Sequence, residues 1–186
     1  MNNWQRMVWD QRELFLQGFV VTLQVCAVAF VCALLGGLLL ALVRMKLPPL
    51  RPLAVILIEF FRATPVLVQL LWVNYVWPEL IGWPNSFFTA ACVALALQSS
   101  GYLAETFRGA LDAIPRGQFE AAGSLGISRT RAFLRIALPQ MLLDAAPSIG
   151  NQFTVIVKSS ALVSGVAVPD LMFESQKLGD RWYEAM

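Results

Sequence analysis

The stretch GFVVTLQVCAVAFVCALLGGLLLALV, Gly18–Val43, decides the fold class of this chain. It holds 26 consecutive residues without a charged side chain. A helix of that length extends roughly 39 Å, which exceeds the ~30 Å hydrocarbon core of a bilayer, so it can cross with some tilt. A buried helix of a soluble protein is a poor alternative, because 186 residues leave little room for several such segments. The stretch therefore predicts a membrane-spanning helix.

Composition indicates the same class for the rest of the chain. Hydrophobic residues make up 58% of it, charged residues only 14%, and histidine is absent. A soluble domain carries roughly a quarter charged residues. We therefore predict an all-α integral membrane helical bundle. The net charge of +2 gives no reason to expect a nucleic-acid partner.

Neither a metal site nor a cleaved leader is predicted. Cys26, Cys32 and Cys92 lie in apolar stretches, are odd in number and lack CxxC spacing, which favours packing thiols. The first apolar run is too long for the core of a signal peptide. Because the acidic residues Asp10 and Glu13 precede it, we expect this segment to remain in the mature protein.

Charge spacing predicts four spans. They are Gly18–Val43, about Leu53–Trp77, a span within Leu80–Ala104 that starts near Phe87, and Ala145–Val168. The first span is closed by Arg44 and Lys46 and by the break at Pro48-Pro49. Pro65 is expected to kink the second, because proline cannot donate a helical hydrogen bond.

Positive charge is spread unequally over the loops, and this sets the predicted orientation. The loop around Pro78–Ser86 carries no lysine or arginine, whereas the first and third loops are basic. Their cations are Arg44, Lys46 and Arg51 in the first loop, and Arg108, Arg116, Arg129, Arg131 and Arg135 in the third. These two loops are therefore predicted to be cytoplasmic and the N-terminus external. Trp72, Trp77 and Trp83 then lie where an interfacial aromatic belt is expected.

These spans predict three regions along the chain. Residues 1–17 form an external N-terminal segment, and residues 18–171 form the transmembrane domain, with a long cytoplasmic loop at about residues 105–139. Residues 172–186 are polar, so either the chain stops there or a final span is missing.

The long cytoplasmic loop has the sequence pattern of a helix–turn–helix. Pro115 suits the first helical position, and good helix formers follow from Gln118 through Leu125. Gly126 can end that helix in the left-handed conformation. Ser128 is a predicted N-cap of a second helix through Ala137, and Pro139 is expected to mark the next break.

This loop is a candidate contact for an energy-supplying partner. The chain lacks the G-x4-G-K-[ST] phosphate loop, so it would receive mechanical work through contact. The small residues Ala121 and Ala122 suit close seating in a groove. Glu120, early in its helix, suits the positive end of the helix dipole and could meet a basic residue. The residues alone leave an alternative equally open, an amphipathic helix resting on lipid headgroups beside Arg129, Arg131 and Arg135.

The same loop resembles a known family motif. Glu120-Ala121-Ala122, three residues, Gly126, nine residues, Ile136, one residue and Leu138-Pro139 match every defined position of the EAA loop of ABC importer permeases. Phe61–Gln69 resembles the FRGTPLLVQ stretch of the polar amino acid subfamily, which serves histidine, glutamine, glutamate and arginine. Further matches are Gly101–Glu105, Phe107–Gly109, Asn151–Phe153 and Lys158. The resemblance covers about Gly18 to Leu171.

The resemblance implies a MetI-like permease subunit in a bacterial cytoplasmic (inner) membrane. It implies three kinds of protein partner: a dimer of ATPase subunits that bind ATP and Mg, a second permease subunit that is identical or homologous, and an external amino-acid-binding protein. The chain itself would bind no cofactor and carry no catalytic group. Its implied coupling residues are Glu120, Ala121, Ala122, Gly126, Ile136 and Pro139.

Polar residues within predicted spans are candidates for the substrate pathway, because they are costly in lipid. The candidates are Arg62, Gln98, Tyr102, Lys158, Ser159 and Ser160. Each has a structural alternative. Arg62 can pair with Glu59 three residues away, and Lys158 can pair with a carboxylate of a neighbouring subunit. Small hydroxyl residues, such as Ser99 and Ser100 beside Gln98, are commonly helix-packing contacts.

Ser159 departs from the subfamily pattern Lys-Asp-Thr/Ser-Ser-Leu, which leaves open whether this subunit forms a substrate site itself. Two other function classes also remain open at this stage. One is a self-sufficient secondary transporter or channel that uses Glu59, Arg62 and Lys158 as a relay, and the other is a membrane scaffold. The ordered cytoplasmic loop favours the importer subunit.

Overall fold

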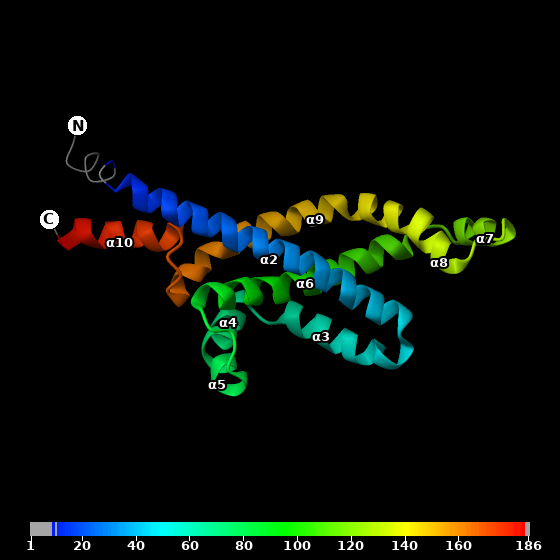
Figure 1. Ribbon diagram of the computed structural model, residues 1–186, viewed down its shortest axis with the longest axis horizontal. Coiled ribbons are helices and arrows are strands. Elements are labelled where there is room, and N and C mark those ends of the chain that lie inside the picture. Colours follow the sequence, from blue (N-terminus) through cyan, green and yellow to red (C-terminus); the bar gives the residue numbers. More distant parts are fainter. Residues whose placement is uncertain (1–8, 10, 185–186) are drawn as a thin grey trace. The chain divides into compact units, whose positions relative to one another are not determined.

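The computed structural model describes residue 9 and residues 11–184, and their regular elements are all helical (Figure 1). Asp10 and the outer ends of the predicted terminal segments, residues 1–8 and 185–186, lie outside the described residues. The longer helices are α2 (Arg12–Lys46), α3 (Arg51–Ala63), α6 (Phe87–Asp112), α9 (Leu138–Ser160) and α10 (Leu171–Glu184). The shorter ones are α4 (Val66–Leu71), α5 (Trp77–Ile81), α7 (Arg116–Ser124) and α8 (Arg129–Ala132). The all-α prediction is confirmed.

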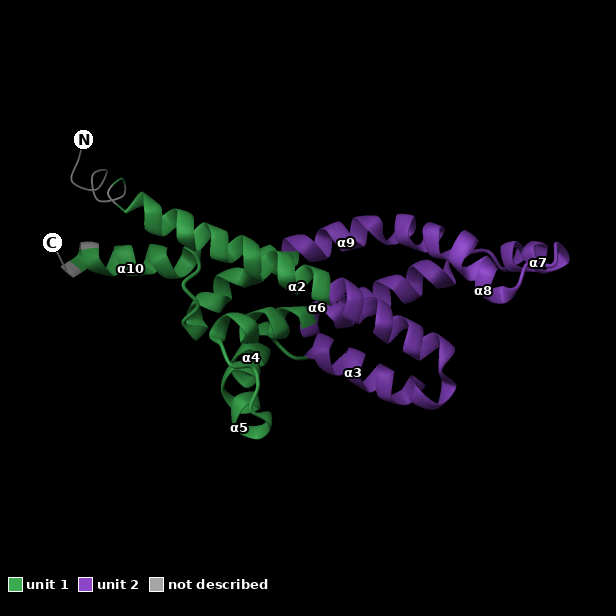
Figure 2. Ribbon diagram, viewed as in Figure 1, with its two compact units in different colours: residues 1–32, 64–96, 155–186 green, residues 33–63, 97–154 purple. Residues whose placement is uncertain are grey.

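Four short helical segments of other geometry connect these helices. They are the 3-10 segments η1 (Pro48–Leu50) and η4 (Ala161–Val166) and the π-turns η2 (Trp72–Val76) and η3 (Phe133–Ala137). By contacts, the chain forms two compact units (Figure 2). Unit 1 comprises residues 1–32, 64–96 and 155–186, and unit 2 comprises residues 33–63 and 97–154.

Two described helices are long and apolar enough to cross a membrane, α2 and α6. Two further candidates are helix pairs interrupted by short breaks, Pro48–Ala63 with Val66–Ile81 and Arg129–Val166 with Leu171–Arg181. The count among the described residues is therefore two, or up to four if each interrupted pair is one span. The first predicted span lies within α2, and the third begins at Phe87 as predicted. The number of spans stays a prediction.

The second predicted span is broken rather than kinked at Pro65. Helix α3 ends at Ala63, and α4 begins at Val66. Pro65 has ψ 139°, which is extended backbone. Proline disfavours helical geometry in the residue before it, and its ring clashes with a carbonyl of the preceding turn. The chain therefore leaves helical geometry at Thr64-Pro65 and resumes it one residue later.

The prediction that Pro139 breaks the helix is wrong. The helix continues from α8 through η3 into α9, so it extends past Pro139 to Ser160. In the π-turn η3 the Leu138 N–H donates to the carbonyl of Phe133, five residues back. This wider turn relieves the clash of the proline ring with the carbonyl four residues earlier. The π-turn η2 stands in the same relation to Pro78, with Trp77 donating to Trp72.

Two helix boundaries differ from the expected ends of the long loop. Residues 105–112, predicted as its beginning, are the last turns of α6. Helix α9, which contains most of the predicted fourth span, begins at Leu138, and the helical segment η4 that follows it ends at Val166. Glu105, Arg108 and Asp112 are paired within α6, so these charges do not interrupt the helix. The membrane boundaries themselves stay predictions.

Unit 2 has a core of small and aliphatic side chains. Its buried members are Ala33, Ala41, Ile58, Leu103, Ala104, Phe107, Ile114, Ala137, Met141 and Ala145. Small residues let helices approach closely in a membrane protein. At Gly37 an added Cβ would lie 2.7 Å from the Cβ of Leu103, so α2 and α6 pack there at backbone distance.

Two predictions concern side chains of unit 1. The ring centroids of Trp72 and Trp77 are 5.4 Å apart, and those of Trp77 and Trp83 are 6.4 Å apart, so the predicted tryptophan cluster forms. All three cysteines are unpaired; Cys26 and Cys92 are buried, as predicted for packing thiols, whereas Cys32 is exposed, contrary to that prediction.

Candidate functional site

The helix–turn–helix predicted within the loop of about residues 105–139 forms as α7, a turn and α8. Pro115 is the N-cap of α7 and not its first helical residue, so the helix begins one residue later than predicted, at Arg116. Gly126 has φ +71°, the left-handed conformation that the sequence predicts for it. Its N–H donates to the carbonyl of Gly123 at 3.0 Å, and the Ile127 N–H donates to that of Ala122 at 3.0 Å. These two bonds form a Schellman motif, which ends α7 sharply.

The EAA residues differ in what they present to a partner. Glu120 and Ala121 are exposed, whereas Ala122 is only 3% exposed and packs within the chain. In this structure Ala122 packs within the chain and does not face a partner, so its predicted coupling role stays a prediction. Glu120 is the fifth residue of α7, beyond the first turn in which the helix dipole acts, so the dipole argument fails. Within the triplet, Glu120 and Ala121 are the two exposed residues.

The remaining motif residues lie beyond α7. Ile136 is half-buried in η3, and Pro139 is exposed in α9. Ser128 occupies the predicted N-cap position of α8, but its side chain makes no capping hydrogen bond. Helix α7 is attached to α9 by a reciprocal amide pair. Gln118 donates to Gln140 at 3.1 Å, and Gln140 donates back at 2.7 Å.

A groove of 480 Å³ lies beside the exposed face of α7. Its lining residues are Lys46, Phe119, Glu120, Gly123, Ile127, Arg129, Ala132 and Phe133. Apolar side chains and charges of both signs therefore face one recess. Lys46, at the end of α2, lies 4.8 Å from the ring centroid of Phe133 in a cation–π contact. Such a mixed surface suits a protein segment better than a lipid headgroup layer, which would favour cations alone.

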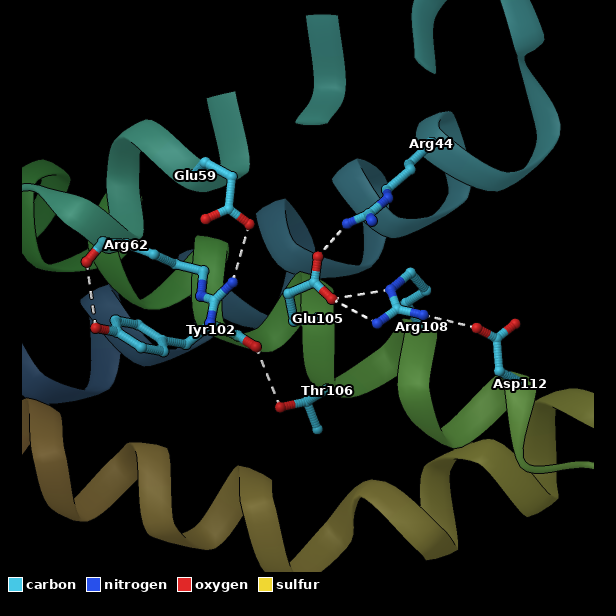
Figure 3. Close-up of polar contacts among 8 residues, drawn as sticks. All are labelled: Arg44, Glu59, Arg62, Tyr102, Glu105, Thr106, Arg108 and Asp112. Atoms are coloured by element: carbon cyan, nitrogen blue, oxygen red, sulfur yellow. Dashed lines mark hydrogen bonds and ion pairs between the residues drawn. The ribbon is translucent and has the colours of Figure 1, made fainter. Parts of the chain in front are cut away.

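Two of the candidate pathway residues are close together in unit 2 (Figure 3). Arg62 pairs with Glu59 at 3.1 Å, as the spacing predicts. Tyr102 donates its hydroxyl to the backbone carbonyl of Arg62 at 3.3 Å, and its ring centroid lies 5.4 Å from the guanidinium carbon. Gly101 makes room, since a Cβ there would lie 3.0 Å from Cγ of Arg62. The sequence provided no signal for a contact across 40 residues.

The other pathway candidates differ in their exposure and in their hydrogen bonds. Lys158 is exposed, and Gln98 and Ser159 are half-buried. The buried Ser160 donates to the carbonyl of Val157 at 2.8 Å, within its own helix. Two neighbours of Gln98 are structural. Gln152 donates to Ser99 at 3.1 Å, and Ser100 donates to Leu97 at 2.7 Å.

A row of alternating charges on α2 and α6 was missed by sequence reasoning (Figure 3). Arg44 of α2 pairs with Glu105 of α6. Glu105 also pairs with Arg108 at 2.8 Å, and Arg108 pairs with Asp112 at 2.7 Å. The spacing of three and four residues within α6 is a signal that could have found the last three. Arg44 counted only as a loop charge, because nothing in the sequence places it beside Glu105.

Comparison with known proteins gives matches over most of the chain. The family model "Binding-protein-dependent transport system inner membrane component" matches residues 33–181. The chain is 35% identical over 177 residues to "Probable amino-acid permease protein YxeN" of Bacillus subtilis, covering 94% of this chain and 79% of that protein. It is 33% identical over 176 residues to "Arginine transport system permease protein ArtQ" of the same organism, covering 93% and 80%. The solved "Crystal structure of an amino acid ABC transporter with histidines" matches with a TM-score of 0.86 at 35% identity, covering 98% of this chain and 85% of that chain.

Proposed function

Because the chain belongs to the family of inner-membrane components of binding-protein-dependent transport systems, we propose that it is the permease subunit of an ATP-driven importer for polar amino acids. The membrane role belongs to the family as a whole. The substrate class is supported by relatives described as amino-acid and arginine permeases. The single observation that carries the energy-coupling role is the exposed α7 with its Schellman turn beside a mixed-charge groove.

In this proposal α7 docks on a separate ATPase subunit. Glu120 and Ala121 present the contact, and Gly126 sets the turn. The buried Ala122 packs α7 within the chain, and Ile136 and Pro139 belong to the helical segment that follows α8. The chain lacks a phosphate-binding loop, so ATP and Mg bind to the ATPase pair, and the chain itself binds no cofactor and performs no catalysis. When ATP binds and the ATPase pair closes, α7 would be displaced and the translocation pathway would open to the external side. Hydrolysis would return the pathway to its inward-open state.

The translocation pathway in this proposal includes Arg62, Gln98, Tyr102 and Lys158, with Ser159 and Ser160 beside Lys158. An arginine guanidinium binds a carboxylate well, and every amino acid substrate carries one. Arg62 is held in place by Tyr102 and Glu59. Its side chain is still 34% exposed, so part of the guanidinium remains available to a carboxylate. Lys158 is an exposed cation of α9, and either the substrate or the second permease subunit would supply its anionic partner.

The partner set in this proposal follows from the family. A second permease subunit, identical or homologous, completes the pathway, and an external binding protein delivers the amino acid. The location is the bacterial cytoplasmic (inner) membrane, with several spans and the N-terminus outside. The region from residue 18 to 171 is the permease domain, and the coupling segment, residues 113–139, lies within the predicted loop of about residues 105–139.

Reconstitution tests the proposed function. Proteoliposomes would contain this chain with its ATPase and second permease, and MgATP would be supplied on the ATPase side. We expect uptake of labelled arginine or glutamine that requires ATP, the ATPase and the binding protein together, and that unlabelled leucine does not compete. Uptake by the chain alone without ATP would instead identify a self-sufficient secondary transporter. ATPase assembly without any uptake would support a scaffold.

Substitution of Glu120 tests the docking surface. Glu120→Lys places a third cation in the groove with Lys46 and Arg129. We expect co-purification of the ATPase to fall while membrane insertion is unchanged, because repulsion replaces attraction at the contact. Asp180→Lys is the matched control, since Asp180 is an exposed acidic residue of α10. Equal ATPase recovery with both variants would contradict the docking role.

A further inference from the structure

The last turn of α2 carries two cations that contact different neighbours in unit 2. Arg44 pairs with Glu105 of α6, and Lys46 lies against the ring of Phe133 in η3, the turn that follows the coupling helices. Two positions spaced in this way are separated by roughly 200° around an α-helix. The two cations therefore leave nearly opposite sides of α2, and one helix end contacts both α6 and the coupling segment.

Helices α2 and α6 are joined a second time, two turns before Arg44. A Cβ at Gly37 would lie 2.7 Å from Leu103 Cβ and 3.0 Å from the carbonyl oxygen of Ser100. The seven residues from Gly37 to Arg44 correspond to about two turns, so both lie on nearly the same face of α2. This face of α2 packs closely against the backbone of α6 at Gly37, and two turns later Arg44 forms an ion pair with α6.

Glu105 is the carboxylate that joins the two helices (Figure 3). Its Oε1 accepts from Arg44, and its Oε2 accepts from Nε and Nη2 of Arg108, each at 2.8 Å. The side chains of Arg44 and Glu105 are only 19% and 20% exposed. A carboxylate with both oxygens used in charge-assisted bonds is held in one orientation. Asp112, by contrast, pairs with Arg108 inside α6 and is 57% exposed.

We propose that Glu105 is a positioning residue that makes the last turn of α2 a relay between the coupling segment and α6. This inference rests on the proposed function. Movement of α7 and α8 reaches α2 through the contact of Phe133 with Lys46. The Arg44–Glu105 pair then passes it to α6, which carries Tyr102 beside Arg62. Energetic coupling is carried by such chains of packed and hydrogen-bonded groups.

The test measures amino acid transported per ATP hydrolysed in the reconstituted complex. Glu105→Gln and Arg44→Gln should each lower this ratio on the order of tenfold while ATP hydrolysis persists, because α7 still binds the ATPase but no longer moves α6. The double variant should lose no more than the poorer single variant, since both changes remove the same bridge. Arg44→Lys retains the charge and should retain most of the ratio.

Two further variants sharpen the assignment. Asp112→Asn removes a carboxylate from the same charge row but breaks no contact between helices, so its transport ratio should equal that of the natural chain. Lys46→Gln removes the other contact of the relay, and it should lower the ratio as Glu105→Gln does. Both variants are compared with Glu105→Gln for membrane insertion and for recovery of the ATPase.

The outcomes separate three possibilities. A normal ratio in Glu105→Gln, or a double variant whose loss is the product of the two single losses, would overturn the relay. Failure of Glu105→Gln and Arg44→Gln to insert or to assemble with the ATPase would assign the bridge to folding and would overturn it too. If the natural chain itself fails to couple ATP hydrolysis to uptake, the proposed function is wrong instead.

Discussion

At Gly126 the backbone turns with φ +71°, and this one torsion angle separates α7 from α8. A Cβ added at this glycine would meet no atom within 4 Å beyond its chain neighbours, so the requirement is conformational and not steric. Ala122, four residues earlier, differs in being buried, so a larger side chain there would have to displace its neighbours. The motif therefore combines a glycine in the left-handed conformation, a buried alanine and two exposed residues, Glu120 and Ala121, to which we assign the proposed docking contact.

A pair of substitutions at Gly126 separates the backbone requirement from docking. Gly126→Val should destabilise the turn by about 1–2 kcal/mol, because a β-branched residue resists the left-handed conformation. Gly126→Asn should be tolerated, since asparagine adopts it readily. The measurement is transport per ATP together with the melting temperature of the complex. Gly126→Arg, which adds both strain and bulk, should uncouple transport most strongly. Equal activity of the valine and asparagine variants would contradict this account.

At the scale of elements, helix breaks and wide turns occur where proline follows. The helix ends beside Pro65, whereas π-turns precede Pro78 and Pro139 and the helix continues through both. A wider turn frees the carbonyl that the proline ring would meet. Pro147 lies inside α9 without a break or a π-turn, so proline alone does not decide where a helix ends. Helix α7 is too short to be stable alone, so its contacts with the rest of unit 2 decide its position.

The reciprocal amide pair between Gln118 and Gln140 is the contact of α7 that is most readily tested. Gln140→Ala removes two neutral hydrogen bonds, worth roughly 1–3 kcal/mol together. We expect amide hydrogen exchange in residues 116–124 to accelerate by about tenfold, because local opening becomes easier. The double variant with Gln118→Ala should exchange no faster. Gln176→Ala, at an exposed position of α10, is the control. If this variant accelerated amide exchange in residues 116–124 by the same factor, the acceleration could not be assigned to the Gln118–Gln140 pair.

At the scale of the whole molecule, the proposed function requires that the chain be inserted in the membrane in one direction. The charge-poor segment at Pro78–Ser86 and the arginine-rich segment around α8 are predicted to face opposite sides of the membrane. The proposed function requires this arrangement, because α7 would contact the ATPase on the cytoplasmic side and the binding protein would deliver substrate on the external side. Family membership supports this arrangement, and the direction of insertion remains a prediction.

Cysteine labelling in right-side-out vesicles measures the orientation directly. The native Cys26, Cys32 and Cys92 would first be replaced by alanine. Asn85→Cys should then react with an impermeant maleimide, because its loop is predicted to be external. Ser124→Cys, exposed at the end of α7, should react only after the vesicles are opened. Labelling of the two positions in the reverse pattern would show that the predicted orientation is inverted.

Local sequence was enough to predict the membrane class, the start of α6 at Phe87, the glycine turn at Gly126 and the pairing of Glu59 with Arg62. Each depends on charge-free length, local conformational preference or spacing along one helix, which neighbours in sequence specify. Helix packing was needed to reveal that Ala122 is buried, that Tyr102 holds Arg62 and that Arg44 pairs with Glu105. The last two contacts join residues 40 and 61 positions apart in the sequence, so they are set by how whole helices pack and no local pattern encodes them. The burial of Ala122 depends on how α7 packs against the rest of the chain.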